Sequence, residues 1–267
     1  MKKEFRKTRK IKKKGSILKN RFFWLGVSIA VFTELLLYLV VLLPLFQIQE
    51  VRVKENIEVS ENKIKSVVLQ DLWKRFLFFP TASILLADTQ GIGDNLLETL
   101  LELETVSIQR KFPNVLVVSV QEKRTVALWC KESRCFALDN EGVAFKKAHV
   151  STDFPVITSL REAPENLGET VVTKDALLAV LDFSREMKRR SLLLGNEVSV
   201  RFRIVSENQI DAATPEGWSI YFTRTQDLFW QITKLQTVLE NKIPPEKRRK
   251  LEYIDVRFGD QAYLKYR

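Results

Sequence analysis

Residues 22–46, FFWLGVSIAVFTELLLYLVVLLPLF, decide how this chain is organised. As a helix, a run of this length spans about 37 Å, which exceeds the roughly 30 Å hydrocarbon core of a bilayer. A cleaved signal peptide has a shorter apolar core and small residues before the cut, whereas this run leads into LLPLFQIQEV. Its length and flanking charge also disfavour the buried helix of a soluble protein. We therefore expect an uncleaved transmembrane helix over residues 22–46.

The basic charge of the chain is concentrated in front of this run. The chain carries a formal net charge of +10, and residues 1–21 alone hold eleven Lys and Arg against one Glu. The remaining residues are therefore neutral overall. A basic tail can be a nucleic-acid arm, but one that adjoins an apolar span sets membrane orientation. We expect residues 1–21 in the cytoplasm, residues 47–267 outside it, and no nucleic-acid partner.

The segment that follows the span has the pattern strand, helix, helix, strand, strand. Residues 48–53 alternate apolar and polar side chains, and Ser60 can cap a helix with apolar positions at helical spacing. Residues 76–93 form a broken apolar connection, after which Asp94 can cap a second helix over 96–103. Two strands, at 105–111 and 115–120, meet at Phe112-Pro113-Asn114. This order predicts a compact α+β unit.

From residue 125 the pattern is mainly that of antiparallel strands with two helices. The helices are expected at 175–189, after Thr173, and at 226–240. Strands are expected at 198–205, 209–213 and 218–222. Two closing strands, 253–258 and 262–266, are expected to meet at a tight Gly259-Asp260 turn, which places the last strand at or near a sheet edge.

A set of residues in these segments stands in a characteristic order and spacing: Phe46, Ile48, Val51, Val53, Ser60, Val106, Ile108, Arg110, Pro113, Val117, Val120, Glu122, Arg124, Val126, Trp129, Leu138, Gly142, Phe145, Tyr253, Asp255, Arg257 and Phe258. In this order and spacing the chain resembles the FtsQ/DivIB family of bacterial division proteins. It implies a POTRA-like domain over 47–124 and the family's β domain over 125–267. Glu55 departs from the family, which commonly has glycine there, so we expect another turn geometry at that position.

The resemblance also implies a function. A protein of this family is a non-enzymatic scaffold of the divisome, needed for septum formation at the cytoplasmic membrane. Its partners would be FtsB- and FtsL-like proteins and the septal cell-wall synthesis machinery. Carried over from the family motif, the residues expected to contact a partner are Arg257, Phe258, Tyr263, Lys265 and Tyr266.

The residue content argues against catalysis. His149 is the only histidine, which excludes an HExxH motif and leaves one imidazole at most for a triad or metal site. We expect it in a solvated loop. Gly91-Ile-Gly93 lacks the rest of a phosphate-binding motif, so no cofactor or metal is predicted. Two alternatives stay open: a membrane-anchored cell-wall hydrolase that uses a carboxylate pair, and another envelope assembly factor with a POTRA domain.

Cys130 and Cys135 flank the short segment 131–134 between two apolar runs. Their spacing and number do not match a zinc motif. They are either two separate buried thiols or, because the segment should lie outside the cytoplasm, a disulfide across a hairpin with a four-residue loop.

Glu34 lies at the centre of the apolar run, where a carboxylate costs about 2.5–3.5 kcal/mol on insertion scales. Gly26, Ala30 and Glu34 fall at i, i+4 and i+8, a stripe of small residues that leads to the carboxylate. Two interpretations stay open. Either Glu34 is neutral and bonded to Tyr38 or Thr33 of its own helix, or the stripe docks the membrane helix of a partner.

Overall fold

The computed structural model describes residues 21–72, 74–76, 79–151, 153–159, 164, 166–192, 200–206 and 208–267. The basic tail expected at 1–21 lies almost wholly outside these residues, as does the start of the strand expected at 198–205. Contacts between residues divide the chain into two compact units. The smaller comprises residues up to 54, 62–93 and 107–119, and the larger comprises 55–61, 94–106 and 120–267. The predicted domain boundary at 124/125 stays a prediction.

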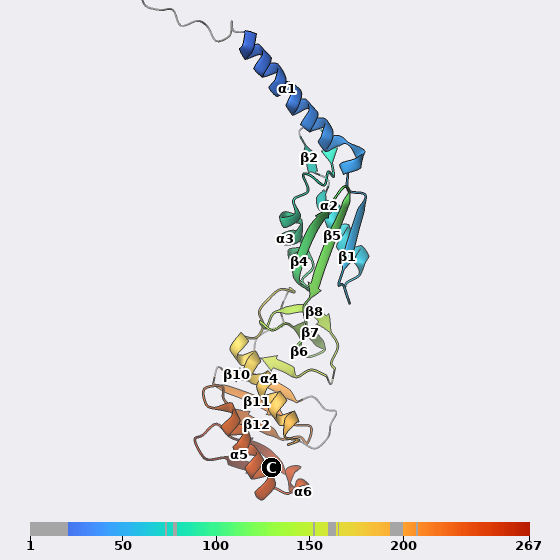
Figure 1. Cartoon of the computed structure of the whole chain (residues 1–267). Coiled ribbons are helices and arrows are strands. Elements are labelled where there is room, and N and C mark those ends of the chain that lie inside the picture. Colours follow the sequence, from blue (N-terminus) through green and yellow to red (C-terminus); the bar gives the residue numbers. More distant parts are fainter. Residues whose placement is uncertain are drawn as a thin grey trace, which may run out of the picture. The chain divides into compact units, whose positions relative to one another are not determined.

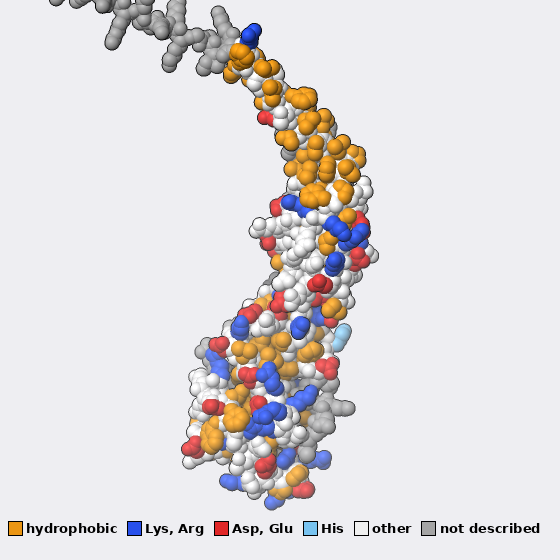
Figure 2. Space-filling view, in the orientation of Figure 1, with side chains coloured by type: hydrophobic (Ala, Val, Ile, Leu, Met, Phe, Trp, Pro, Cys, Tyr) orange, Lys and Arg blue, Asp and Glu red, His pale blue; other side chains and the backbone are white. Residues whose placement is uncertain are grey.

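The apolar run forms a helix with no buried residue. Helix α1 (Arg21–Leu42) is followed by the short 3-10 helix η2 (Pro44–Phe46). The main helix ends before Pro44 because proline lacks the N–H that would continue the hydrogen-bond ladder. Of the described helices, α1 alone is long and apolar enough to cross a membrane, and Figure 2 shows its largely apolar surface. This exposed apolar helix indicates membrane anchoring.

The expected β-α-α-β-β unit is present (Figure 1). Strand β1 (Glu50–Lys54) runs parallel to β5 (Val115–Glu122), and β4 (Leu103–Lys111) completes a sheet of order β1-β5-β4. Helix α2 (Glu61–Leu72) starts directly after Ser60 and buries Ile64, Val68 and Leu72, which share one helix face. A small hairpin that the sequence did not predict, β2 (Lys74–Phe76) with β3 (Phe79–Thr81), lies in the connection between the helices.

The second helix of this unit starts earlier than predicted. Helix α3 is Thr89–Thr99, so Asp94 lies inside it rather than at its cap. The carboxylate of Asp88 accepts the backbone N–H of Gly91 at 3.0 Å and supplies the N-terminal acceptor instead. Gly91 and Gly93 cost helix propensity, but the burial of Ile92 and Leu96 outweighs that cost.

The turn after β1 also differs from expectation. Glu55 has φ +67°, the left-handed conformation that glycine adopts without strain. The turn therefore keeps the geometry that suits the family's usual glycine, and Glu55 adopts it at a cost in backbone strain. The expectation of another geometry was wrong.

The rest of the chain builds one mostly antiparallel sheet of order β14-β13-β12-β11-β10-β9-β6-β7-β8. Its strands are β6 (Ala127–Lys131), β7 (Arg134–Leu138), β8 (Ala144–Ala148), β9 (Val156–Ser159), β10 (Arg201–Ser206), β11 (Gln209–Ala213), β12 (Ser219–Phe222), β13 (Leu251–Asp255) and β14 (Tyr263–Tyr266). Strand β9, which was not predicted, lies between β6 and β10 and runs parallel to both. It joins the strands before it to those after it in a single sheet.

Helices α4 (Lys174–Arg189) and α5 (Leu228–Asn241) cover the main core of this sheet, and the short α6 (Pro245–Arg248) precedes β13. In that core the ring of Phe183 on α4 stacks on Phe222 of β12, with 4.0 Å between centroids. Alternate residues of β6 face opposite ways: Trp129 enters this core, and Leu128 enters a small second cluster. Thr173 is the N-cap residue of α4, as predicted, but its side chain makes no capping bond.

Two turns differ from the sequence-based expectation. Lys131 pairs with Arg134, so the β6–β7 loop has two residues rather than four, with Glu132 at φ +55°. Strand β13 ends at Asp255 and β14 begins at Tyr263, so their connection is longer than a Gly259-Asp260 turn. Phe258 therefore lies in the connection and not in a strand.

Candidate partner-binding site

Strand β14 lies at one end of the sheet order. It pairs antiparallel with β13, and the described part of the chain provides no strand on its other side. The edge position expected from the sequence is therefore confirmed. An edge strand presents N–H and C=O groups that an extended segment of another protein can pair with.

Arg257 is held within the chain. Its guanidinium donates to both carboxylate oxygens of Asp255, at 2.9 and 2.6 Å, and to Oε1 of Gln209 at 2.8 Å. The hydrogen bond to Asp255 raises the pKa of Arg257, so the side chain stays charged. The guanidinium of Arg257 is thus occupied by Asp255 of its own chain, and it also lies 5.4 Å from the Phe258 ring centroid.

The remaining predicted contact residues are exposed. The rings of Phe258 and Tyr263, each 51% exposed, meet edge to face with 5.5 Å between centroids. Tyr266 is 46% exposed. Lys265 forms an ion pair with Glu252 of β13 at 2.9 Å, and this hydrogen-bonded contact raises the pKa of Lys265. Phe258 and β14 therefore form an accessible aromatic surface beside a free sheet edge.

A buried lysine, which sequence reasoning missed, lies beneath this surface. The ammonium of Lys234 on α5 donates to the carbonyl oxygens of Val256 at 2.7 Å and Gly259 at 2.6 Å, with a longer contact to Phe258 at 3.4 Å. Burial lowers the pKa of Lys234, against the opposing charges of Asp260 and Asp255. The only sequence signal was a lysine on the apolar face of a helix, beside the buried Leu235.

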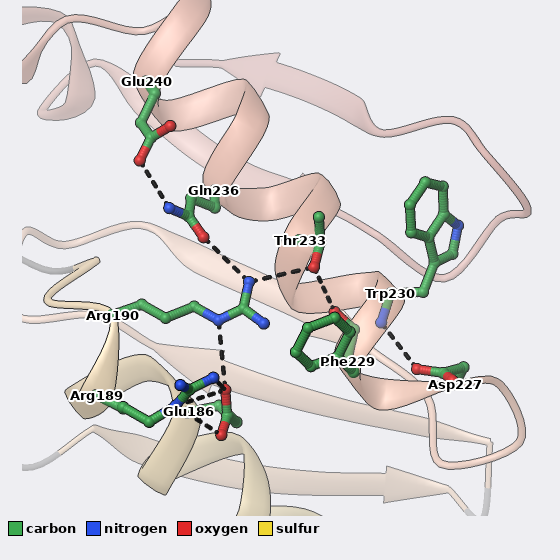
Figure 3. A network of polar contacts seen from close by, with 9 residues as sticks. All are labelled: Glu186, Arg189, Arg190, Asp227, Phe229, Trp230, Thr233, Gln236 and Glu240. Atoms are coloured by element: carbon green, nitrogen blue, oxygen red, sulfur yellow. Dashed lines mark hydrogen bonds and ion pairs between the residues drawn. The ribbon is translucent and has the colours of Figure 1, made fainter.

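A polar network joins α4 to α5 (Figure 3). The guanidinium of Arg190, directly after α4, donates to Thr233 at 3.1 Å, to Gln236 at 3.0 Å and to Glu186 at 3.3 Å. It also lies 4.5 Å from the ring centroid of Phe229, a cation–π distance. The network fixes α5 against α4.

The predicted membrane-helix face is accessible. Gly26, Ala30 and Glu34 are exposed, and a Cβ added at Gly26 would meet nothing within 4 Å. The hydroxyl of Thr33 donates to the backbone carbonyl of Ile29 at 2.9 Å and not to Glu34. The α1 surface therefore leaves room for a second helix at this stripe.

A cavity of about 770 Å³ lies within the larger unit. Its lining residues include Ile57, Glu58, Glu122, Lys123, Leu128, Lys146, His149 and Phe154. Lys123 pairs with Asp139 at 2.8 Å, and Lys146 pairs with Glu58. His149 is exposed, as predicted. Within the described ranges, no group of three or more His, Cys, Asp or Glu residues could hold a metal ion.

Cys130 and Cys135 lie directly opposite each other in β6 and β7 and are joined by a disulfide. Both residues are buried in the small second cluster with Leu128 and Phe145. The cross-strand register explains how residues five apart come together, because a two-residue turn places them in a facing pair.

These features define a membrane-anchored protein with a POTRA-type β-α-α-β-β domain and a β domain that ends in an open edge. Residues 46–123 match the FtsQ-type POTRA domain family. Together with the apolar helix α1 directly before it, this match supports an FtsQ/DivIB-like protein. The FtsQ-type POTRA domain indicates a division-related protein that acts through protein–protein contacts. The chain has no significant match among curated proteins.

Proposed function

We propose that this chain is a non-enzymatic scaffold of the bacterial divisome that is needed for septum formation. It is anchored in the cytoplasmic membrane at the septum, with its N-terminus in the cytoplasm and its folded domains outside. The observation that carries the proposal is the FtsQ-type POTRA match at residues 46–123, directly after a helix able to span a bilayer. A POTRA-type domain next to a membrane is well placed to bind other membrane proteins.

The partners in this proposal are FtsB- and FtsL-like proteins, through which the chain is linked to septal cell-wall synthesis. The open edge of β14 supports this role because a partner segment can add to it as a further strand. Exposed aromatic side chains of the kind found at binding hot spots, Phe258 and Tyr266, lie next to that edge. Arg257 contributes by holding its cation against the Phe258 ring, and Lys265 contributes at the rim.

The proposal is tested by depletion and complementation. Cells depleted of the protein should grow as filaments without septa, and the full chain should restore division. A chain that ends at Asp260 lacks β14 and should fail, provided that it reaches the membrane in normal amounts. The control is Leu178→Ala, which shortens an exposed apolar side chain on α4. Cells that carry this variant should divide normally.

Two results would contradict the proposal. Normal septation after depletion would remove the division role, and full complementation without residues 261–267 would remove the role of β14. The hydrolase alternative is tested separately with purified full chain and isolated cell wall. Release of soluble wall fragments would show that the chain is an enzyme and would contradict the proposed scaffold function.

A further inference from the structure

The buried ammonium of Lys234 donates its hydrogen bonds to one short connection of the chain. Lys234 is 6% exposed, and the acceptors of its three N–H donors are the carbonyls of Val256, Phe258 and Gly259. All three acceptors belong to the connection between β13 and β14. The lysine therefore binds the backbone on both sides of Phe258 from the inner side.

A lysine at this buried position costs more free energy than an apolar side chain would. Burial of an ammonium costs free energy, which an apolar side chain of similar length would not incur. That cost is offset by the hydrogen bonds that the ammonium donates to the connection. Here the ammonium holds a segment in which Phe258 keeps an apolar ring 51% exposed beside Tyr263.

The connection is fixed from its other side as well. The backbone N–H of Arg257 donates to Asp255 at 3.1 Å, and the Arg257 side chain donates to Asp255 and Gln209. Residue 257 is thus bound through its side chain and residues 256, 258 and 259 through their carbonyls. The backbone on both sides of Phe258 is therefore held in place.

The helix that carries Lys234 is itself held in place. Arg190 joins it to α4 through Thr233, the residue before Lys234 (Figure 3). One turn of helix earlier, buried Gln231 donates to the carbonyl of Thr223 at 2.7 Å and accepts its N–H at 2.9 Å. Helix α5, which carries the ammonium of Lys234, is therefore itself held in a fixed position.

We propose that Lys234 is a positioning residue for the partner site, which sets the connection between β13 and β14 in its binding form before the partner arrives. The inference rests on the proposed function of β14. The occupant is an extended segment that pairs with β14 and places an apolar side chain against the Phe258 and Tyr263 rings. A site ordered in advance avoids the cost of ordering the connection on binding.

The first test is the affinity of the full chain, in detergent, for the FtsB-like protein of the same organism. Lys234→Met keeps the length of the side chain and removes the donors, and it should weaken binding about tenfold, mainly through faster dissociation. Lys234→Arg keeps a cation with donors and should recover part of the loss. The control is Lys242→Met, an exposed lysine directly after α5, which should bind like wild type.

Binding is measured well below the thermal unfolding midpoint of each variant. A loss that persists in fully folded Lys234→Met supports positioning. A loss that disappears once the variant is fully folded shows a merely structural role and overturns the inference. Unchanged binding by Lys234→Met overturns it too, while leaving the proposed function intact. If wild type does not bind, or binds equally well without residues 261–267, the proposed function fails and the inference falls with it.

A second measurement needs no variant. In hydrogen exchange of the unbound wild-type chain, the N–H groups of Val256 and Gln261, which donate to the carbonyls of Tyr221 and Phe258, should exchange more slowly than freely exposed amides, because the connection is ordered before binding. Exchange of both groups at the rate of exposed amides would overturn the inference even if Lys234→Met failed to fold.

Discussion

The side chain of Glu122, at the end of β5, binds the backbone of the segment that follows β1. Its carboxylate accepts the N–H groups of Ile57, Glu58 and Val59 at distances of 2.7 to 3.0 Å. Burial would raise the pKa of Glu122, but these three donors outweigh it and hold the pKa below the ordinary 4.5. The carboxylate therefore ties two sequence-distant segments of the larger unit together.

This arrangement predicts how stability depends on pH. A carboxyl whose pKa is lowered on folding contributes stability above its ordinary pKa, and this is lost as pH falls through the folded value. Glu122→Gln should unfold at a lower temperature than wild type at pH 7, and the gap should close as the pH falls below about 4.5. Thermal unfolding of the full chain across this range measures the effect. Glu98→Gln, an exposed position on α3, is the control, and parallel curves for Glu122→Gln and wild type would contradict the prediction.

Substitutions at two glycines with positive φ would distinguish the cost of backbone strain from the cost of steric overlap. Gly142 has φ +80° and Gly217 has φ +90°. An added Cβ at Gly142 would overlap the carbonyl oxygen of Val172, whereas at Gly217 the nearest atom would lie 3.6 Å away. We expect Gly217→Ala to cost about 1–2 kcal/mol and Gly142→Ala about 1–3 kcal/mol more. Chemical denaturation of both variants measures the difference, and equal losses would show that the chain around Val172 gives way without cost.

At the scale of single elements, periodicity predicted those with strong one-sided patterns. Helix α4 buries six residues on one face, and it was expected within one residue of its actual bounds. Helix α3 was misplaced because its two glycines resemble a loop signal, and only the tertiary burial of Ile92 and Leu96 outweighs them. Strand β9 is placed by its parallel pairing with β10 and β6, which no local pattern encodes.

The β6–β7 hairpin carries a prediction about its cysteines. Because Cys130 and Cys135 face each other across the strands, a bridge should form in protein isolated without reductant. Digestion followed by mass spectrometry should find both cysteines within one linked peptide. Free thiols that react with an alkylating agent at both positions, in freshly isolated protein, would contradict this.

The membrane helix carries a prediction about its small-residue stripe. We expect Gly26 and Ala30 to admit a partner helix closely, with Glu34 hydrogen-bonded across the interface. Leu at both small positions, or Glu34→Leu alone, should lower recovery of FtsL- or FtsB-like proteins from detergent while insertion stays normal. Ser28→Leu, off the stripe, is the control. Equal recovery after the whole helix is exchanged for an unrelated one would assign Glu34 no partner role.

At the scale of the whole molecule, the order of most elements could be read from the sequence, with β2, β3 and β9 missed, but their arrangement in the sheet could not. Sequence neighbours such as β6, β7 and β8 pair as hairpins, which patterning and turn residues predict. The parallel pairs β9–β10 and β12–β13 join strands separated by helices, and no local pattern encodes such partners. For the same reason Lys234 could not be assigned: its acceptors lie more than twenty residues away, in a connection that was predicted as a tight turn.

The asymmetric charge of the chain predicts its topology. The basic excess precedes α1, so residues 1–21 should stay in the cytoplasm and the folded part should cross the membrane. A reporter active only in the cytoplasm should work when fused before Phe22 and fail when fused after Arg267. The reverse pattern would overturn the orientation and, with it, the proposed division role.

The end position of β14 also determines how the molecule would behave under tension. In the proposed role the chain would transmit force between its membrane anchor and a bound partner, and among the described strands β14 forms a ladder only with β13. The load would be shared by four paired positions, the Lys265–Glu252 ion pair, and the bonds from Arg267 to the carbonyls of Lys250 and Gly217. A pull along the strand would shear all of these bonds at once, whereas a pull across it would break them one after another. The direction in which a partner draws on β14 would therefore set how long the linkage lasts while the envelope constricts.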